Sequence, residues 1–140
     1  MRLLDASPAD GDESAVLVAY GGFWDDWMAV AAAPREPVPA SEHADGRGQA
    51  VLDQLAVTLT QAGNGIEGTM VMDEPVVSFD EVRQSAAVSS CADQAELEPV
   101  LFDGSPGAPE AQSRLRTEVT LARSAEGWKV SGLDITSAPC

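Results

Sequence analysis

The chain has 140 residues, of which 44% are hydrophobic and 22% are charged, the composition of an ordinary globular protein. Its formal net charge is −15, and this acidity argues against a nucleic acid as partner. No apolar run reaches the roughly 20 residues that a membrane span requires. We therefore expect one domain over residues 1–140, with residues 1–6 flexible.

The first residues show no signal peptide. They carry one positive charge and the apolar pair Leu3-Leu4, whereas a signal peptide has an apolar segment of roughly 7–15 residues. We therefore expect a cytoplasmic protein, or the mature part of an exported one with a start methionine added. The two cysteines, Cys91 and Cys140, allow one pairing, but from the residues alone they can equally be two unrelated thiols.

A first helix is predicted from the N-terminal region to just before Pro34. Ser7 followed by Pro8 is typical of a helix start, with a capping hydroxyl and a proline at the first helical position. The Gly21-Gly22 pair weakens the helix interior, so packing must offset it. Apolar side chains recur in steps of three and four and define one face. They are Val16, Tyr20, Phe23, Trp24, Trp27 and Ala31.

A second helix is predicted over about Arg47–Gln61, after a short helical turn around Ala40–Asp45. The segment Gly63-Asn64-Gly65 stops it, because glycine is favoured just past a helix end. Its expected apolar face, with Leu52 beside it, consists of Ala50, Val51, Leu55, Leu59 and Ala62.

After Gly65 the apolar period falls to two and β-branched residues appear, which is typical of strands. The predicted strands are Ile66–Met72, Val76–Glu81, Arg83–Ala92, Ser113–Arg123 and Trp128–Thr136. Ala125-Glu126-Gly127 is a hairpin turn, and Asp103–Ala111 is a loop rich in glycine and proline. Helices followed by such strands predict an α+β fold, with N-terminal helices packed on one side of a curved, mainly antiparallel sheet.

Short motifs add a family resemblance to this order of elements. They are Tyr20-x-x-Phe23-Trp24, Gly65-x-x-Gly68-Thr69, Ser89-Ser90-Cys91-Ala92-Asp93, Gly127-Trp128-Lys129-Val130 and the terminal Cys140. From about Ser14 onward the chain resembles small actinobacterial proteins of the nuclear transport factor 2-like superfamily, many of them exported proteins or lipoproteins of unassigned function. Ser90 departs from the family pattern, which often has Asp there. The resemblance implies a cone-shaped, cystatin-like fold around a cavity, and a Cys91–Cys140 disulfide.

The resemblance leaves two classes of function open, because this fold serves both. Many members are binding or dimerisation modules, and we expect a non-enzymatic binding domain for an apolar small molecule. Its cavity would be lined by Phe23, Trp24 and Trp27, although rings at helical spacing also fill cores and dimer interfaces. Other members are acid–base enzymes such as ketosteroid isomerases and polyketide cyclases. The alternative is therefore an isomerase, cyclase or dehydratase for an apolar polyketide- or terpenoid-like substrate.

Three titratable side chains are the candidates for such catalysis. Ketosteroid isomerases place a proton-donating tyrosine on the first helix, as Tyr20 is placed here; a packed tyrosine with a bonded hydroxyl is the alternative. Asp93 lies two residues beyond Cys91 and shares its face of the strand, either as an acid or base in the cavity or as an Asx turn. His43, the single histidine, would complete an acid–base pair or lie on the surface.

No cofactor and no metal are expected. One histidine and two distant cysteines lack the spacing of a transition-metal site, and the chain has neither a glycine-rich phosphate loop nor a nucleophile elbow. The acidic charge fits a basic protein partner, as in inhibitors or immunity-type proteins, because opposite charges steer association.

We further expect a homodimer formed through the outer, convex face of the sheet. In the strand over 113–123 the side chains alternate between two faces. The face toward the helices carries Leu115, Thr117, Val119 and Leu121. The outer face mixes charges and small residues, which suits a two-fold interface that sets arginine against glutamate. It carries Arg114, Arg116, Glu118, Thr120 and Ala122.

Overall fold

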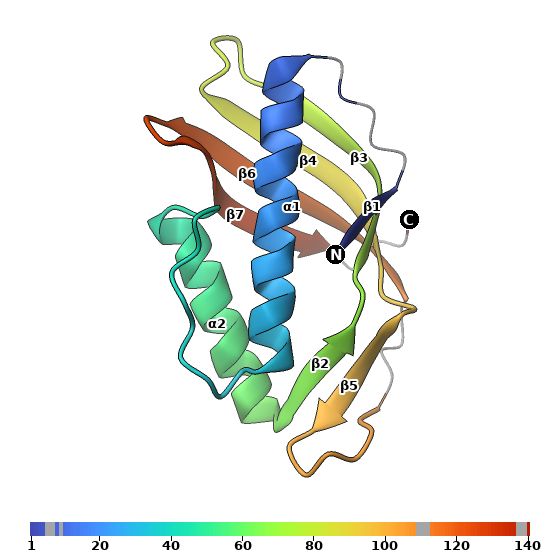
Figure 1. Ribbon diagram of the computed structural model, residues 1–140. Coiled ribbons are helices and arrows are strands. Elements are labelled where there is room, and N and C mark those ends of the chain that lie inside the picture. The colour runs from blue at the N-terminus through green and yellow to red at the C-terminus, as the bar shows by residue number, and fades with distance from the viewer. Residues whose placement is uncertain (5–7, 9, 109–112, 137–139) are drawn as a thin grey trace.

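The computed structural model describes residues 1–4, 8, 10–108, 113–136 and 140. A five-stranded sheet curves around the long helix α1 (Gly11–Ala32), and the second helix, α2 (Gly46–Ala62), lies beside α1 near one edge of the sheet (Figure 1). The sheet stays open, because its two edge strands do not pair with each other. The predicted α+β class is confirmed.

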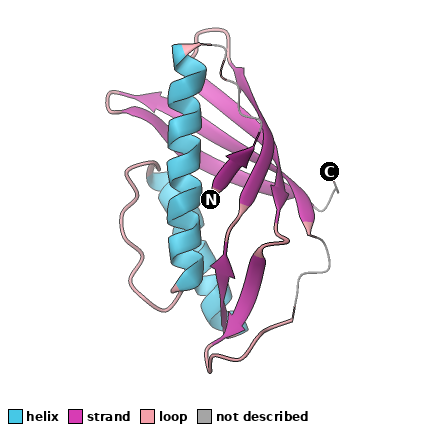
Figure 2. Cartoon of the chain, turned by 45° about the vertical axis from the view of Figure 1, so that its right-hand side comes forward, coloured by secondary structure: helices cyan, strands magenta, loops and turns pink. Residues whose placement is uncertain are grey.

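The sheet has the strand order β1-β3-β4-β6-β7, with β1 parallel to β3 and the other neighbours antiparallel. Its strands are β1 (Arg2–Leu4), β3 (Val71–Phe79), β4 (Ser85–Asp93), β6 (Arg114–Ser124) and β7 (Gly127–Thr136). A separate antiparallel ribbon of β2 (Asn64–Gly68) and β5 (Leu97–Leu101) extends beyond the sheet (Figure 2).

Helix α1 begins later than the sequence predicts. Ser7 lies outside the described residues, and Asp10 is the N-cap, where its Oδ1 accepts a hydrogen bond from the Glu13 N–H at 2.9 Å. Asp10 and Asp12 each also lie 3.0 Å from the guanidinium of Arg83. The Asp10 carboxylate therefore caps the first turn of α1 and also connects the start of the helix to the turn between β3 and β4.

The apolar stripe of α1 is confirmed as the centre of the core. All six expected positions are buried: Val16, Tyr20, Phe23, Trp24, Trp27 and Ala31. The Trp24 ring lies 6.0 Å from that of Phe23 and 5.5 Å from that of Trp27, centroid to centroid. This packing offsets the helix-weakening Gly21-Gly22 pair.

The buried face of α2 differs from the predicted one. Ala50 and Ala62 are exposed, and Leu52 lies at the centre of the buried stripe instead of beside it. The stripe consists of Gly48, Leu52, Ala56 and Leu59. The reason is a close approach of the helix to β7: a Cβ at Gly48 would lie 2.1 Å from the carbonyl oxygen of Val130. Glycine has no apolar side chain, so a search for apolar periodicity does not detect that Gly48 is buried.

The segments on either side of α2 match the prediction only in part. Gly63, with φ of 79°, ends the helix as expected. The predicted helical turn at Ala40–Asp45 does not form a helix, because Ala44 instead forms a parallel bridge with Val130 of β7. The backbone groups of this segment thereby find partners on the edge of the sheet.

The predicted strand Ile66–Met72 is two strands. The chain turns at Gly68, whose φ is 109° and where a Cβ would lie 2.0 Å from the Glu96 carbonyl oxygen. The part before the turn is β2, and the part from Val71 onward joins the predicted Val76–Glu81 strand as β3 through a bulge. Glycine at φ > 0 marks such a break, which alternation alone does not reveal.

Two strands are not predicted at all. Residues 2–4 are assigned to a flexible start, yet they form β1, with the Arg2 N–H donating to the Met70 carbonyl at 2.9 Å. β5 contains Pro99, which argues against a strand in a sequence pattern but is tolerated in a short ribbon.

The later predicted strands are present with ends shifted by up to two residues, and the hairpin turn is confirmed. The predicted Asp103–Ala111 loop is irregular over its described residues, 103–108.

The disulfide between Cys91 and Cys140 is present, with the two Cα atoms 5.9 Å apart. On β4 the buried residues alternate with partly exposed ones, and Cys91 belongs to the partly exposed set that faces away from α1. The bridge therefore holds the last residue against the outer face of the sheet.

Neither described helix is long and apolar enough to cross a bilayer.

Candidate functional site

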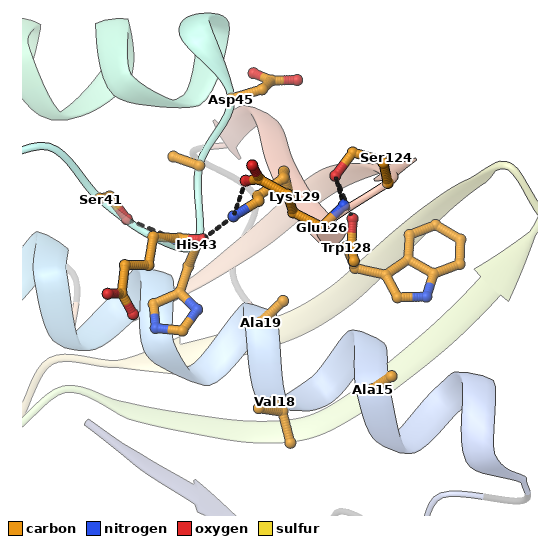
Figure 3. Close-up of a pocket in the computed structure, with 14 residues that line it drawn as sticks. Ala15, Val18, Ala19, Ser41, His43, Asp45, Ser124, Glu126, Trp128 and Lys129 are labelled. Atoms are coloured by element: carbon orange, nitrogen blue, oxygen red, sulfur yellow. Dashed lines mark hydrogen bonds and ion pairs between the residues drawn. The ribbon is translucent and has the colours of Figure 1, made fainter.

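An open groove of about 1050 Å³ lies beside the N-terminal half of α1 (Figure 3). Its other walls are the segment 41–45, which precedes α2, and the hairpin between β6 and β7. The lining residues with apolar side chains are Ala15, Val18, Ala19, Ala44, Ala125 and Trp128. Val18, at the margin of the α1 wall, is 68% exposed, which is a high exposure for an apolar side chain.

Trp128 anchors the hairpin wall. Its ring is buried and lies 5.8 Å from the ring of Phe79, centroid to centroid. Arg123 lies over the Trp128 ring at 5.7 Å and also lies 3.9 Å from Asp12 at the start of α1. The wall is therefore a packed part of the sheet whose rim reaches the helix.

Segment 41–45 is held in place from both sides. The His43 carbonyl accepts the Val130 N–H at 2.7 Å, and the Asp45 N–H donates to the Val130 carbonyl at 3.0 Å. Asp45 is also the N-cap of α2, accepting the N–H groups of Arg47 and Gly48. Burial acts to raise its pKa, but hydrogen bonds from the Ser131 hydroxyl and these N–H groups outweigh burial and hold the pKa below its usual range. The groove therefore has fixed walls.

Most side-chain donors around the groove are engaged within the protein. The Ser41 hydroxyl donates to Asp26 at 2.5 Å, and the Ser124 hydroxyl donates to a carbonyl of its own turn at 2.8 Å. The Lys129 ammonium donates to the main-chain carbonyl of Glu42. The ring N–H groups of His43 and Trp128 are the other side-chain donors in the lining.

The charge around the groove is acidic. Glu42, Asp45 and Glu126 line it against the single ammonium of Lys129, which lies 3.8 Å from the Glu126 carboxylate. The Glu42 carboxylate makes no ion pair or hydrogen bond with any residue that the structure describes, and the Glu126 side chain is 83% exposed. The groove therefore presents carboxylate oxygens to whatever enters it.

His43 lies at the edge of this groove with its ring against α1 (Figure 3). A Cβ added at Gly22 would lie 2.4 Å from the ring atoms Cδ2 and Nε2, so the ring packs directly on the helix backbone. The second glycine of the Gly21-Gly22 pair thus makes room for the histidine. Of the three candidate catalytic residues, His43 is the one that lines the groove.

Tyr20 is buried in the core instead. Its hydroxyl lies near Ser90, Trp24 and Thr117, and burial raises its pKa to about 12 even though these neighbours act to lower it. Neither the Tyr20 hydroxyl nor the Trp24 indole N–H has a hydrogen-bond partner of good geometry in the described structure. The tyrosine stays protonated at neutral pH, but it is 0% exposed and does not line the groove.

Asp93 lies on the opposite side of the sheet from Tyr20. The buried residues of β4 are its even-numbered positions, including Ser90, while Asp93 shares the outer face with Cys91. Its carboxylate accepts the Ala95 N–H at 2.9 Å, which is the Asx turn that the sequence offers as the alternative. It also pairs with Arg114 at 3.2 Å. The structure does not bring Tyr20 and Asp93 together.

The three rings proposed as a cavity wall belong to the core. Phe23 and Trp24 are 0% exposed and Trp27 is 6% exposed, and none of them lines the groove. Among the described residues there is also no group of three or more histidine, cysteine or acidic side chains that could hold a metal ion.

The groove residues of segment 41–45 and of the hairpin, other than His43, are missed by sequence reasoning. Trp128 is the one available signal, since a large aromatic ring beside a hairpin turn needs a packing partner. Its partner Phe79 and the α1 wall of the groove come from other parts of the chain, and no local pattern links them.

Comparison with known proteins gives a likeness of fold. No family model matches the chain, and no curated sequence matches it significantly. The intermembrane space region of the chloroplast protein ARC6 aligns over 94% of this chain and 100% of its own, with a TM-score of 0.54 and 15% identity. Aln2 from a Streptomyces species aligns over 86% of this chain and 88% of its own, with a TM-score of 0.52 and 12% identity. The Kfla4162 protein from Kribbella flavida aligns over 89% of both chains, with a TM-score of 0.49 and 16% identity.

Proposed function

We propose that the protein is a non-enzymatic binding domain of the nuclear transport factor 2-like kind, and that its ligand occupies the groove between α1 and the β6–β7 hairpin. The observation that carries the proposal is the apolar wall that Ala15, Val18 and Ala19 of α1 give this groove, at whose margin Val18 is 68% exposed. Exposed apolar surface in a fixed concave site is typical of a binding site.

Binding is favoured over acid–base catalysis by the positions of the candidate residues. A general acid and a general base must both reach the same substrate. Tyr20 is enclosed in the core, Asp93 is engaged on the outer face, and His43 lines the groove without either of them. A disulfide persists mainly in oxidising compartments, so we also propose that the protein works in an exported setting.

The experiment is the binding of a neutral apolar fluorophore, N-phenyl-1-naphthylamine, followed by its fluorescence increase. We expect Val18→Glu to weaken binding by about tenfold, because it places a charge on the apolar α1 wall of the groove. Val57→Glu is the matched control, since Val57 is 48% exposed on α2 and does not line the groove. Equal binding by the wild type and Val18→Glu would contradict the proposal.

A further inference from the structure

The groove offers its ligand more hydrogen-bond acceptors than free donors. The hydroxyls of Ser41 and Ser124 and the ammonium of Lys129 already donate within the protein. What the rim still presents is mainly acceptors, the carboxylates of Glu42 and Glu126. A ligand that satisfies them must bring N–H donors, and a carboxylate is bound most strongly by a donor that carries positive charge.

The charge of the groove points the same way. Three acidic residues line it against the single ammonium of Lys129, and the whole chain has a net charge of −15. An anionic ligand would be repelled both at a distance and in the groove, whereas a cationic one is attracted at both stages.

The size and shape of the groove favour a chain segment over a small molecule. Its volume of about 1050 Å³ is at the upper end of small-molecule pockets, and it is open to solvent. An open site of this size leaves much of a small ligand in water, but it suits a peptide that places an apolar side chain against the α1 wall.

We propose that the partner is a protein segment in which apolar residues are flanked by lysine or arginine. The apolar residues lie against the α1 wall of the groove, at Ala15 and Val18, and the cationic residues pair with the carboxylates of Glu42 and Glu126. This inference rests on the proposed function, because it names the ligand of the same groove.

The experiment uses three end-blocked peptides that differ only in charge: Lys-Lys-Leu-Leu-Lys-Lys and its glutamine and glutamate counterparts. Binding to the 15N-labelled protein is followed by amide chemical shifts at low and at high ionic strength. We expect the lysine peptide to bind about tenfold more tightly than the glutamine peptide at low ionic strength, with shifts at the groove, and the difference to shrink in high salt. The glutamate peptide should not bind.

A pair of double variants separates groove charge from overall charge. Glu42→Gln with Glu126→Gln should remove most of the preference for lysine over glutamine. Glu67→Gln with Glu98→Gln removes the same charge from the β2–β5 ribbon, where the two residues are paired in register, and should leave the preference unchanged. An equal loss in both double variants would overturn the inference, because it would show attraction to the net charge alone.

The remaining outcomes distinguish the inference from the function on which it rests. The inference of a cationic protein segment fails if the lysine and glutamine peptides bind the groove equally, or if octylamine binds it as tightly as the lysine peptide. The proposed binding function of the groove is not contradicted by either result. If no peptide shifts the groove while N-phenyl-1-naphthylamine still binds there, only the inference fails. If neither binds there, the proposed function fails as well.

Discussion

The two faces of the five-stranded sheet differ in composition and in what they do. On β4, Ala86, Val88 and Ser90 are buried toward α1, while Ser89 and Cys91 between and beyond them face outward. The inner face meets four aromatic rings of α1 and leaves no room for a ligand. The outer face carries a disulfide and charged side chains in place of an apolar core.

This difference explains where the groove lies. The face that α1 covers is filled by aromatic rings of the helix itself, which are buried against the sheet. The opening occurs at the hairpin end, where small residues of α1, such as Ala15 and Ala19, face the wall at Trp128. The large aromatic side chains of α1 thus fill the space under the sheet, whereas Ala15 and Ala19 are too small to fill the space beside the hairpin.

The largest expected effect comes from breaking the inner face. Trp27→Ala should lower the free energy of unfolding by about 3–5 kcal/mol, because it removes a buried ring that contacts Trp24. Val18→Ala, on the exposed side of the same helix, should change it by no more than about 0.5 kcal/mol. Urea unfolding of both variants measures the contrast, and a similar loss in the two would refute it.

On the outer face, removing the disulfide should have the next largest effect. The bridge closes a separation of 49 residues, and replacing Cys91 and Cys140 by serine should cost about 2–4 kcal/mol through the greater entropy of the unfolded chain. Peptide mapping of unreduced wild-type protein should find one cross-linked peptide. Two alkylatable thiols in freshly purified protein would count against the bridge.

A smaller effect is expected at the sheet edge, where α2 meets β7. Gly48→Ala should destabilise by about 1–3 kcal/mol, since the new Cβ would lie 2.1 Å from the Val130 carbonyl oxygen. Gly46→Ala in the same helix is the control: no atom lies within 4 Å of its Cβ, and alanine favours helix by up to about 1 kcal/mol. Thermal unfolding should move in opposite directions for the two variants.

Acid should loosen the ends of the helices before it affects the inner face. The N–H of Glu13 and the Arg83 guanidinium lower the pKa of Asp10, and the pKa of Asp45 is lowered as described above. A carboxylate whose pKa is lowered by folding contributes its full stabilisation of the folded state above its unfolded-state pKa of about 3.9. This stabilisation is lost as the pH falls through the lower, folded-state pKa. The melting temperature should therefore drop below about pH 4. Asp10→Asn with Asp45→Asn should flatten this dependence, and an unchanged slope would argue against these two caps.

The weakest expected effect is self-association through the outer face. Arg116, Glu118 and Thr120 are exposed there, as a two-fold interface would require. Because the net charge of −15 opposes association, the dimer should strengthen with salt. Sedimentation velocity at several protein and salt concentrations tests this. A monomer at high protein concentration and moderate salt would exclude the dimer. If the Arg116→Glu variant still forms a dimer, the interface does not lie on the outer face of the sheet.

Much of the fold could be predicted from local patterns. The three- and four-residue steps from Val16 to Ala31 describe the buried face of α1, and the alternation in β6 places Thr117, Val119 and Leu121 inward. The same alternation puts Asp93 on the face of Cys91. What could not be predicted is which face β4 turns toward α1, because both of its faces carry small residues, and therefore that Tyr20 and Asp93 are separated by the sheet.

The sequence by itself determined the periodic elements, because a helix or strand repeats its own burial pattern within a few residues. Tertiary structure decided the rest. The face of α2 follows from the contact of Gly48 with Val130, β1 exists through its pairing with β3, and the groove joins Val18 to Trp128. Each of these depends on residues far apart in the chain, whose side chains or backbone meet only when the sheet curves around α1.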